Sequence, residues 1–317
     1  MSGFWDNIDF VRDELQKVNK IIKRKVRCSE KTIESALIDI FDNNGKMLRP
    51  GFVILAASFG EYDSDKMTQI AAAVEMFHNA TLIHDDILDD SKIRRNMKTV
   101  QEKYGKEAAV LIGDFLLSRC MSLLTVCDQV DTIKGVIRSM ERLSVGEINQ
   151  MMTKKRTDVS INSYLKRIAA KTAILFSLSF FIGAVESRCS KDIANRLKKI
   201  GFDLGMAFQI KDDILDLIGD RTFGKSIGHD LMEGIYTLPV IYALRHDKEL
   251  EEILSSDKIE DLNYLIDRII KNGGIEYSEG LAKRYTSKAL KNIETLPNNS
   301  SKLVLKEIAL QLAERKY

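Results

Sequence analysis

Proline is scarce in this chain, and that scarcity restricts the folds open to it more than any other feature of the sequence. Only three prolines occur in 317 residues, at Pro50, Pro239 and Pro297. Proline breaks helix interiors, because its ring removes a backbone N–H and clashes with the preceding turn. Apolar residues recur with a helical period from about Asp6 to the C-terminus, and the composition, rich in Leu, Ile, Ala, Lys and Glu, also favours helices. We therefore expect an all-α protein.

Short clusters of Gly, Asn, Asp and Pro interrupt the helical pattern and mark expected helix ends. None resembles a long flexible linker, and 44% of the residues are hydrophobic, which is enough for a substantial core. We therefore expect a single domain over residues 1–317. The expected interruptions are residues 42–45, 62–65, 91–99, 154–158, 219–234, 272–274 and 297–299.

The charge balance argues against a nucleic-acid partner. The chain has 48 basic and 46 acidic residues, whereas nucleic-acid-binding domains usually carry a clear basic excess. A basic stretch near the N-terminus is more typical of a solvated helix face. A loose, transient contact with an anionic membrane surface is the alternative interpretation. The stretch contains Lys17, Lys20, Lys23, Arg24, Lys25 and Arg27.

Cysteine spacing and the N-terminus predict a cytoplasmic protein. The four cysteines, Cys28, Cys120, Cys127 and Cys189, have no paired CxxC spacing, so neither a disulfide framework nor a zinc site is expected. The first residues lack the basic start and apolar stretch of a signal peptide. The most apolar segment, residues 172–185, is too short to span a bilayer and contains serines, so we expect a buried helix there.

Two identical D-D-I-L-D sequences, beginning at Asp85 and Asp212, carry the strongest chemical signal. Residues four apart lie on one helix face, so each cluster aligns carboxylates that repel one another unless a cation lies between them. Mg²⁺ prefers oxygen ligands and completes its shell with water and phosphates. A lone cluster could be a solvated helix end, but two copies in apolar helices predict a metal–diphosphate site. Neither cluster has the glycine and distal glutamate of a calcium loop.

Basic groups lie beside these clusters in number sufficient for two diphosphates. Arginine forks and lysine charges are the usual phosphate partners. Each of these residues taken singly is more typical of a protein surface, but their positions beside the clusters favour anion binding. They are Lys46 and Arg49 before an expected helix, Arg94 and Arg95 after the first cluster, Lys171 with Thr172, and Lys225.

The motifs and their order resemble those of the trans-polyprenyl diphosphate synthase family, from about Glu34 to the C-terminus. The resemblance implies the isoprenoid synthase fold, a single large helical bundle around a central cavity. The markers are G-K-x-x-R-P at 45–50, His78, L-I-H-D-D-I-L-D at 82–89, Arg94-Arg95, Gly113-Asp114, Gly146-Glu147, Lys171-Thr172, F-Q-I-K-D-D-I-L-D at 208–216, G-K-x-x-G-x-D-L at 224–231 and T-L-P at 237–239.

The resemblance also implies an activity and a role for each residue of the site. The enzyme would be a Mg²⁺-dependent, homodimeric prenyltransferase of isoprenoid biosynthesis that condenses isopentenyl diphosphate with an allylic diphosphate. Metal ligands, for about three Mg²⁺ ions, would be Asp85, Asp86, Asp89, Asp212, Asp213 and Asp216. Arg94, Lys171 and Lys225 would bind the allylic diphosphate, and Lys46, Arg49, His78 and Arg95 the isopentenyl diphosphate. Thr172, beside Lys171, would also bind substrate. Gln209, with Phe208 beside it, would lie near the reacting centre and, like Lys171 and the aspartates, belong to the catalytic set.

Three positions depart from the family pattern. Asn96 follows the arginine pair where glycine is usual, and Met47 replaces a basic residue. The second lysine that commonly precedes T-L-P is also replaced, since the chain reads Gly-Ile-Tyr-Thr at 234–237. The catalytic set is nevertheless complete. We expect these departures to weaken the affinity for diphosphate.

Product length is predicted from the helix upstream of Asp85. One helix turn rises about 5.4 Å, roughly one extended isoprene unit, so a bulky residue there would stop the growing tail. The expected stripe is Val74, Phe77, Ala80 and Thr81. Ala80 and Thr81 are small, and Phe77 would be a later stop. We expect a C30–C40 product, with C20 geranylgeranyl diphosphate as the alternative.

Two other classes of protein fit less well. A terpene cyclase usually has a mixed Asn/Ser/Glu second metal motif, whereas this chain repeats D-D-I-L-D. A non-catalytic subunit of a two-chain synthase should lack the aspartates, and a purely structural helical protein has no reason to keep them. A catalytic chain that needs a small partner subunit remains an open alternative.

Overall fold

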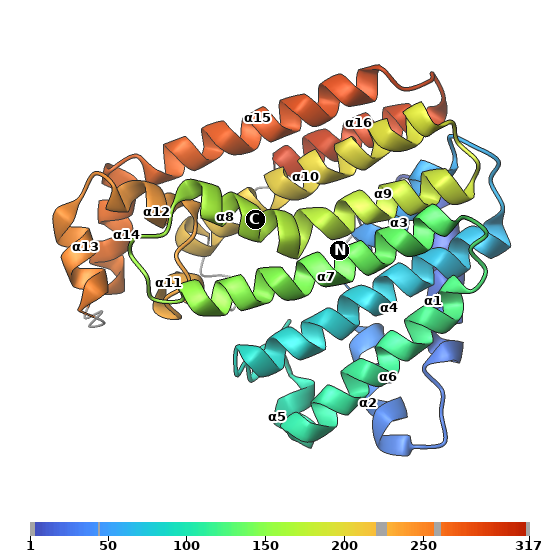
Figure 1. Ribbon diagram of the computed structural model, residues 1–317, viewed down its shortest axis with the longest axis horizontal. Coiled ribbons are helices and arrows are strands. Elements are labelled where there is room, and N and C mark those ends of the chain that lie inside the picture. Colours follow the sequence, from blue (N-terminus) through green and yellow to red (C-terminus); the bar gives the residue numbers. More distant parts are fainter. Residues whose placement is uncertain (1–3, 44, 220–226, 257–260, 315–317) are drawn as a thin grey trace. The chain divides into compact units, whose positions relative to one another are not determined.

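The structure, a computed structural model, is built of helices (Figure 1). It describes residues 4–43, 45–219, 227–256 and 261–314. Within these ranges the strands are two short ones, β1 (Ile93–Arg94) and β2 (Met97–Lys98), which pair antiparallel with Ile93 opposite Lys98. The all-α class predicted from the sequence is confirmed.

The chain divides into two compact units. The first comprises residues 1–135 and 179–195, and the second residues 136–178 and 196–317. The division falls inside three helices, α7 (Val130–Thr153), α9 (Ile174–Glu186) and α10 (Lys191–Ile218). The single domain expected from the sequence stays a prediction.

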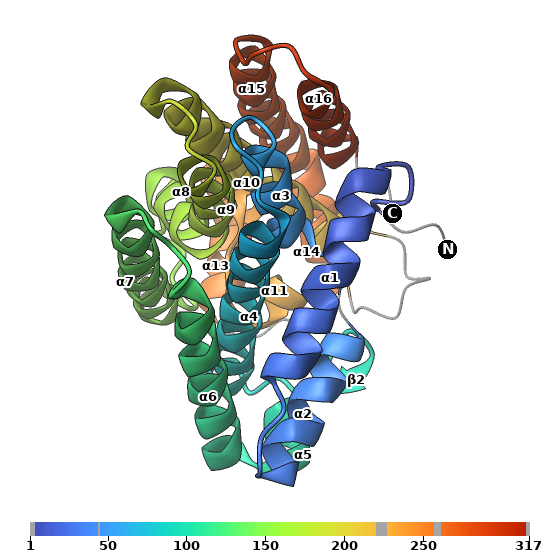
Figure 2. The ribbon, with the colours of Figure 1, turned by 90° about the vertical axis from the view of Figure 1, so that its right-hand side faces the viewer.

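Helix α4 (Ser64–Leu88) is the central element of the first unit. It begins where the Asp63 carboxylate accepts a hydrogen bond from the Lys66 backbone N–H, an N-cap. Residues from Ile70 to Ala73 are fully buried, as expected of a helix that is apolar on all sides. Figure 2 shows α1 (Asp9–Lys25) lying along it. The unit's other helices are α2 (Lys31–Asp42), α3 (Leu48–Ala57), α5 (Val100–Tyr104) and α6 (Lys106–Leu124).

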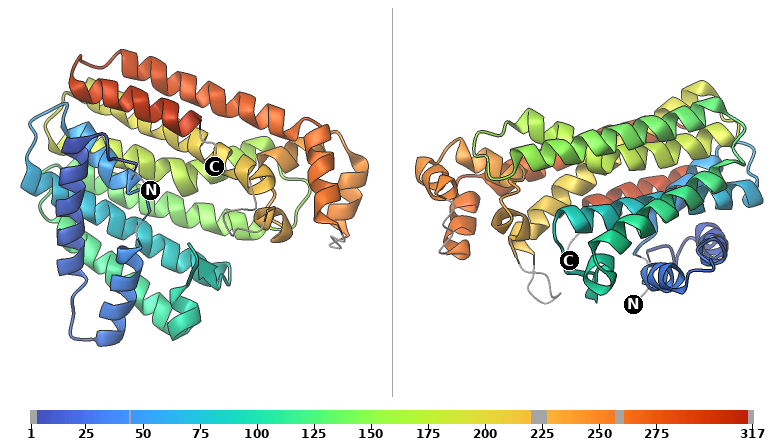
Figure 3. Two further views of the ribbon diagram at one scale, coloured as in Figure 1. Left: turned by 180° about the vertical axis from the view of Figure 1, so that it is seen from behind. Right: turned by 60° about the horizontal axis from the view of Figure 1, so that its bottom comes forward.

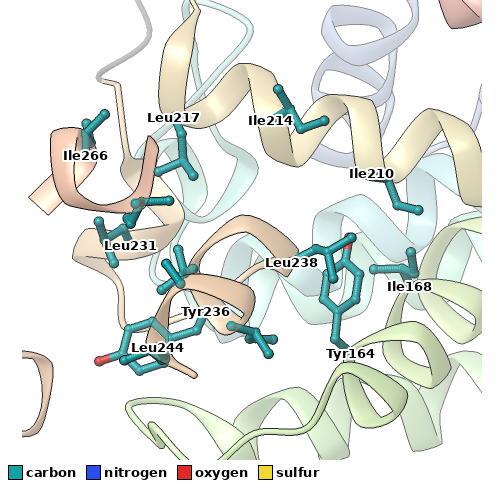
Figure 4. Packing of buried hydrophobic residues seen from close by; sticks show 14 of the residues in the cluster. Tyr164, Ile168, Ile210, Ile214, Leu217, Leu231, Tyr236, Leu238, Leu244 and Ile266 are labelled. Carbon is teal, nitrogen blue, oxygen red and sulfur yellow. The ribbon is translucent and has the colours of Figure 1, made fainter. Parts of the chain in front are cut away.

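The second unit packs its core around the end of α10. Ile210, Ile214 and Leu217 of α10 meet Tyr164 and Leu238 in one buried cluster (Figure 4). Figure 3 shows α15 and α16 side by side, joined by a short turn. The other elements of this unit are α8 (Ile161–Ile168), the π-helical turn η1 (Ala169–Ala173), α11 (His229–Met232), α12 (Leu238–Leu244), α13 (Lys248–Ser255), α14 (Leu262–Lys271), α15 (Gly274–Glu294) and α16 (Ser300–Ala313).

The apolar stretch at 172–185 belongs to a longer helical segment than its sequence suggested. α8, η1 and α9 form a run of 26 residues, Ile161–Glu186, long and apolar enough by length and composition to cross a membrane. The expectation that this region is too short was therefore wrong, because the flanking turns are helical too. In its most apolar window, 67% of the residues are buried inside the structure. The expectation of a buried helix is confirmed.

Candidate active site

The first aspartate cluster occupies the last turn of α4. Asp85 and Asp86 are buried and Asp89 caps the helix. The Nε of Arg94 donates a 2.7 Å hydrogen bond to Oδ1 of Asp86, and the Gln101 side-chain amide donates to the Asp86 carbonyl at 2.6 Å. Burial raises the pKa of Asp86 above its ordinary value, while Arg94 opposes that shift. The cluster is therefore held in place by residues that follow it in the chain.

The arginine pair lies in a tight hairpin immediately after this cluster. Arg95 and Asn96, its two central residues, have φ angles of 50° and 62°, the left-handed backbone of a type I′ turn. Asparagine tolerates this conformation better than most residues. The departure from glycine at position 96 therefore keeps the turn, and the weaker affinity for diphosphate stays a prediction.

The hairpin is joined to the G-K-x-x-R-P loop through Arg95. Its Nη1 donates to the Asn43 carbonyl at 3.3 Å, and a Cβ on Gly45 would come within 2.9 Å of its Nη2. Gly45 thus leaves the space that the guanidinium occupies. The same loop is anchored by Trp5, whose indole N–H donates to the Lys46 carbonyl at 2.7 Å. The role of Trp5 could not be predicted from the sequence, because nothing at its position indicates a contact 41 residues away.

The predicted isopentenyl diphosphate residues influence one another electrostatically. Burial, opposed by Glu75 and assisted by Arg95, lowers the pKa of Arg49 to about 10. Burial, Arg49, Arg95 and Arg94 together hold the pKa of His78 well below its ordinary value. His78 is therefore neutral at pH 7 and can act through hydrogen bonds rather than through charge. This part of the first unit is suited to an anion.

The second aspartate cluster is fixed by a chain of hydrogen bonds. Oδ2 of Asp213 accepts from the Tyr164 hydroxyl at 2.6 Å, and its Oδ1 accepts from the Gln209 amide at 2.8 Å. The Thr172 hydroxyl in turn donates to the Gln209 amide oxygen at 2.6 Å. Burial raises the pKa of Asp213 to about 8, with smaller contributions from Asp230 and Asp212. The two donors oppose this shift and stabilise the carboxylate.

Asp230 is a member of this cluster that we did not assign from the sequence. Its backbone N–H donates to Oδ2 of Asp216 at 3.2 Å, and Gly228, at a φ of 68°, donates its N–H to the Asp216 carbonyl at 2.6 Å. Burial, with Asp216 nearby, raises the pKa of Asp230 to about 6. The motif G-x-D-L at 228–231 was the signal that could have identified it.

Lys171 lies in the π-helical turn η1, a feature frequent at functional sites. Its Nζ forms an ion pair of 3.1 Å with Glu147 of α7, and the neighbouring Gly146 allows α7 to approach closely, since a Cβ there would lie 2.8 Å from that of Ala170. Phe208 is beside Gln209 as predicted, with its ring centroid 5.3 Å from that of Phe176. Lys225 lies outside the described residues.

The four residues predicted to set the product length lie near the middle of α4. Val74, Phe77 and Ala80 are buried, and the Thr81 hydroxyl donates to the His78 carbonyl at 2.8 Å. A cavity of about 70 Å³ in the first unit lies against Asn79, Leu82, Ile83 and Asp86. By helical spacing this face is nearly opposite to that of Val74, Phe77 and Thr81. The cavity is therefore distinct from the proposed path of the tail.

The donor atoms of both clusters suit a hard divalent cation. Among the described residues, however, no group of three or more His, Cys, Asp or Glu side chains gathers closely enough to enclose a metal ion. Mg²⁺ is commonly bound by one or two carboxylates together with water and substrate phosphates, so such a complete cage is not required. The raised pKa values of Asp86 and Asp213 also fit carboxylates that a nearby cation would stabilise. The residues thus fit the metal.

Comparisons with known proteins agree with this chemistry. The family described as polyprenyl synthetase matches residues 30–269. The chain is 34% identical to heptaprenyl diphosphate synthase component 2 of Geobacillus stearothermophilus, over 97% of this chain and 98% of that protein. It is 30% identical to octaprenyl diphosphate synthase of Haemophilus influenzae, over 98% and 97%.

Solved structures give the same result for the fold. The heptaprenyl diphosphate synthase from Staphylococcus aureus matches with a TM-score of 0.92 and 31% identity, over 96% of this chain and 98% of that one. A polyprenyl synthase from Caulobacter crescentus, solved with calcium and isoprenyl diphosphate, matches with a TM-score of 0.92 and 31% identity, over 100% and 99%. The predicted isoprenoid synthase fold is confirmed.

Proposed function

This chain belongs to the polyprenyl synthetase family and is a prenyltransferase, and we propose that it adds isopentenyl diphosphate to an allylic diphosphate to make C30–C40 products. One observation carries the proposal. Each aspartate cluster has a buried carboxylate held by fixed donors, Asp86 by Arg94 and Asp213 by Tyr164 and Gln209. Preorganised carboxylates beside basic groups suit metal-bound diphosphate, whereas solvated helix ends would not be fixed in this way.

The metal requirement is part of the proposal. Mg²⁺, when bound, would neutralise the negative charge that develops on the departing diphosphate. Its ligands would come from the six aspartates of the two clusters, with about three ions as the family resemblance implies. The calcium and isoprenyl diphosphate in the structure of the Caulobacter relative support this assignment.

The chain's own residues would bind and orient the two substrates. Arg94, Lys171 and Lys225 would hold the allylic diphosphate, and Lys46, Arg49, His78 and Arg95 the isopentenyl diphosphate. The Gln209 amide oxygen accepts from Thr172 and one amide hydrogen is donated to Asp213, which fixes the amide plane and leaves the second amide hydrogen for a substrate. Two substrates bound by these residues would have their reacting carbons held close together.

The proposed reaction separates charge between the departing diphosphate and the allylic carbon. The allylic C–O bond breaks with its electron pair leaving on the diphosphate, and the double bond of isopentenyl diphosphate attacks the allylic cation. A proton is lost to the released diphosphate, and the chain is five carbons longer. Apolar surroundings such as the Phe176 and Phe208 rings keep water from the cation.

Product length is tested by a substitution on α4. Phe77→Ala should lengthen the product by one or more isoprene units, because the side chain proposed to stop the tail is removed. Ile83→Ala is the matched control, because Ile83 is also buried on α4 but lines the cavity on the other face of the helix. Chromatography of dephosphorylated products would decide, and an unchanged distribution in Phe77→Ala would refute this stripe as the ruler. A C20 limit, as in the geranylgeranyl synthases among the relatives, is the alternative.

A homodimer is also part of the proposal, supported by the surface of α7. Exposed apolar side chains recur there on one helical face, with exposed fractions from 40% to 72%; they are Val130, Ile133, Ile137, Val145, Ile148, Met151 and Met152. An exposed stripe of this extent usually marks an interface. Ile148→Glu should dissociate the dimer in sedimentation, whereas Leu303→Glu, exposed on α16, should not. A wild-type monomer active only with a second protein would instead favour a two-chain synthase, as the name component 2 suggests for the Geobacillus relative.

We further propose a cytoplasmic location with at most an electrostatic membrane contact. All four cysteines are free thiols, which fits a reducing compartment. The apolar face of α1, including Val11, Leu15 and Ile22, is buried, so this helix cannot also insert into lipid. Its basic residues could only attract an anionic surface. Cosedimentation with anionic vesicles at low and at physiological salt would test this contact.

A further inference from the structure

Tyr164 is the largest of the fully buried side chains among the described residues, and its hydroxyl is directed at the second aspartate cluster. It lies on α8, 49 residues before Asp213, and its Oη donates a 2.6 Å hydrogen bond to Oδ2 of that aspartate. Figure 4 shows the phenol extending from α8 toward α10, beside Ile168 and Leu238. No role was assigned to this residue from the sequence.

The ring of Tyr164 cannot easily turn away from Asp213. It packs in the core with Ile168 and Leu238, and the guanidinium carbon of Arg167 lies 5.5 Å from the ring centroid. Arg167 is itself held, because its Nη2 donates to the Tyr236 carbonyl at 2.6 Å. A tightly packed ring keeps one rotamer, so its hydroxyl is a donor in a fixed position.

Asp213 receives a donor on each carboxylate oxygen. Tyr164 occupies Oδ2 from α8, while Gln209, itself held by Thr172 of η1, occupies Oδ1 from one turn earlier in α10. Two donors from different elements fix both the position and the tilt of a carboxylate. A single donor would allow the group to rotate about its Cβ–Cγ bond.

We infer that Tyr164 is a positioning residue for the diphosphate site, with its hydroxyl fixing the Asp213 carboxylate in the orientation needed to bind Mg²⁺ and diphosphate. This inference rests on the proposed function of the aspartate cluster. Groups that orient metal ligands commonly change metal affinity or activity by about 10- to 100-fold when removed. A purely structural hydroxyl would instead affect thermal stability alone.

The test compares Tyr164→Phe with a matched control. Phenylalanine keeps the ring that fills the core and removes only the donor. Tyr62→Phe is the control, because the Tyr62 hydroxyl also donates a 2.6 Å hydrogen bond to a carboxylate, that of Glu14, but lies at the opposite end of α4 from the first aspartate cluster. For each protein, calorimetry would measure binding of inorganic diphosphate across a range of Mg²⁺ concentrations, and melting would measure stability.

Tyr164→Phe is expected to raise the Mg²⁺ concentration for half-maximal diphosphate binding about tenfold, whereas Tyr62→Phe should match the wild type. In the prenyl-transfer assay, the KM for isopentenyl diphosphate should stay within about twofold while the Mg²⁺ requirement rises. An unchanged Mg²⁺ dependence with a lower melting temperature would overturn the inference, and so would a Tyr164→Phe chain that does not fold. Wild-type protein that binds diphosphate but forms no product would refute the proposed function alone.

Discussion

Arg94 and Asp86 are joined by a 2.7 Å hydrogen bond between Nε and Oδ1, across eight residues that include the end of α4. The bond ties the first aspartate cluster to the arginine hairpin. A ligand that draws the Arg94 guanidinium would therefore also act on the Asp86 carboxylate. Arg94 thus orients the cluster, and in the proposed function it would also bind diphosphate.

Arg94→Ala should lower kcat/KM for the allylic substrate at least about 100-fold, because it removes a charge-assisted bond to Asp86 as well as a phosphate partner. Steady-state kinetics with the allylic diphosphate varied would measure this. Lys92→Ala, an exposed residue of the same loop, is the control and should change it less than threefold. Equal small effects in both variants would contradict the role given to Arg94.

Gly45→Ala should raise the KM for isopentenyl diphosphate about tenfold and leave the KM for the allylic substrate nearly unchanged. The new Cβ would come within 2.9 Å of Arg95 Nη2, so the guanidinium must move. Gly280→Ala is the control, since nothing lies within 4 Å of the Cβ added there. If the two KM values rose together, Gly45 would serve the loop as a whole rather than Arg95.

Asp230→Asn should reduce kcat at least about tenfold and increase the Mg²⁺ requirement, because it removes a negative charge beside Asp216. Asp261→Asn, outside the clusters, is the control. It should leave kcat unchanged, since Asp261 caps the start of α14 by accepting from the Tyr264 backbone N–H. If Asp230→Asn kept the wild-type kcat at the Mg²⁺ concentration that the wild type requires, Asp230 would not be part of the site.

The ion pair of Asp247 and Arg268 should make stability depend on pH. Arg268 donates to both oxygens of Asp247, at 2.6 and 2.8 Å, and holds the pKa of that carboxyl down at about 2. Because the folded pKa lies below the unfolded value of about 3.9, the stabilisation is complete above that value and is lost as the pH falls toward 2.

Asp247→Asn should therefore cost about 1–2 kcal/mol in urea unfolding at pH 7. The difference from wild type should shrink as the pH is lowered from about 4 toward 2. Glu251→Gln, exposed on the same helix α13, should show no such difference. If the loss of unfolding free energy did not vary with pH, the pair would stabilise the fold through packing and neutral hydrogen bonds rather than through ionic attraction.

The helices that end in the aspartate clusters could be predicted from the sequence, because long apolar runs without proline leave few alternatives. α4 and α10 extend over 25 and 28 residues and both carry D-D-I-L-D near their C-terminal ends. Gly105 was missed as a helix break. It separates α5 from α6 at a φ of 87°, and an isolated glycine within a polar segment gives little warning.

The hydrogen-bond partners of the proposed site residues could not be predicted, because these contacts depend on packing between segments that are distant in the sequence. The Tyr164–Asp213 bond spans 49 residues, and Trp5 reaches the Lys46 carbonyl across 41. Periodicity places a residue on a helix face but does not identify the side chain it meets. For the same reason the sequence does not show that Asn96, with its left-handed backbone, preserves the hairpin.

The central claim is tested most directly by incubating the purified chain alone with Mg²⁺, labelled isopentenyl diphosphate and farnesyl diphosphate, followed by chain-length analysis of the products. We expect labelled prenyl diphosphates of C30–C40, formed only when Mg²⁺ is present. Products that stop at C20 would contradict the proposed length, and a failure to extend farnesyl diphosphate at all would contradict the claim that this chain carries a complete active site.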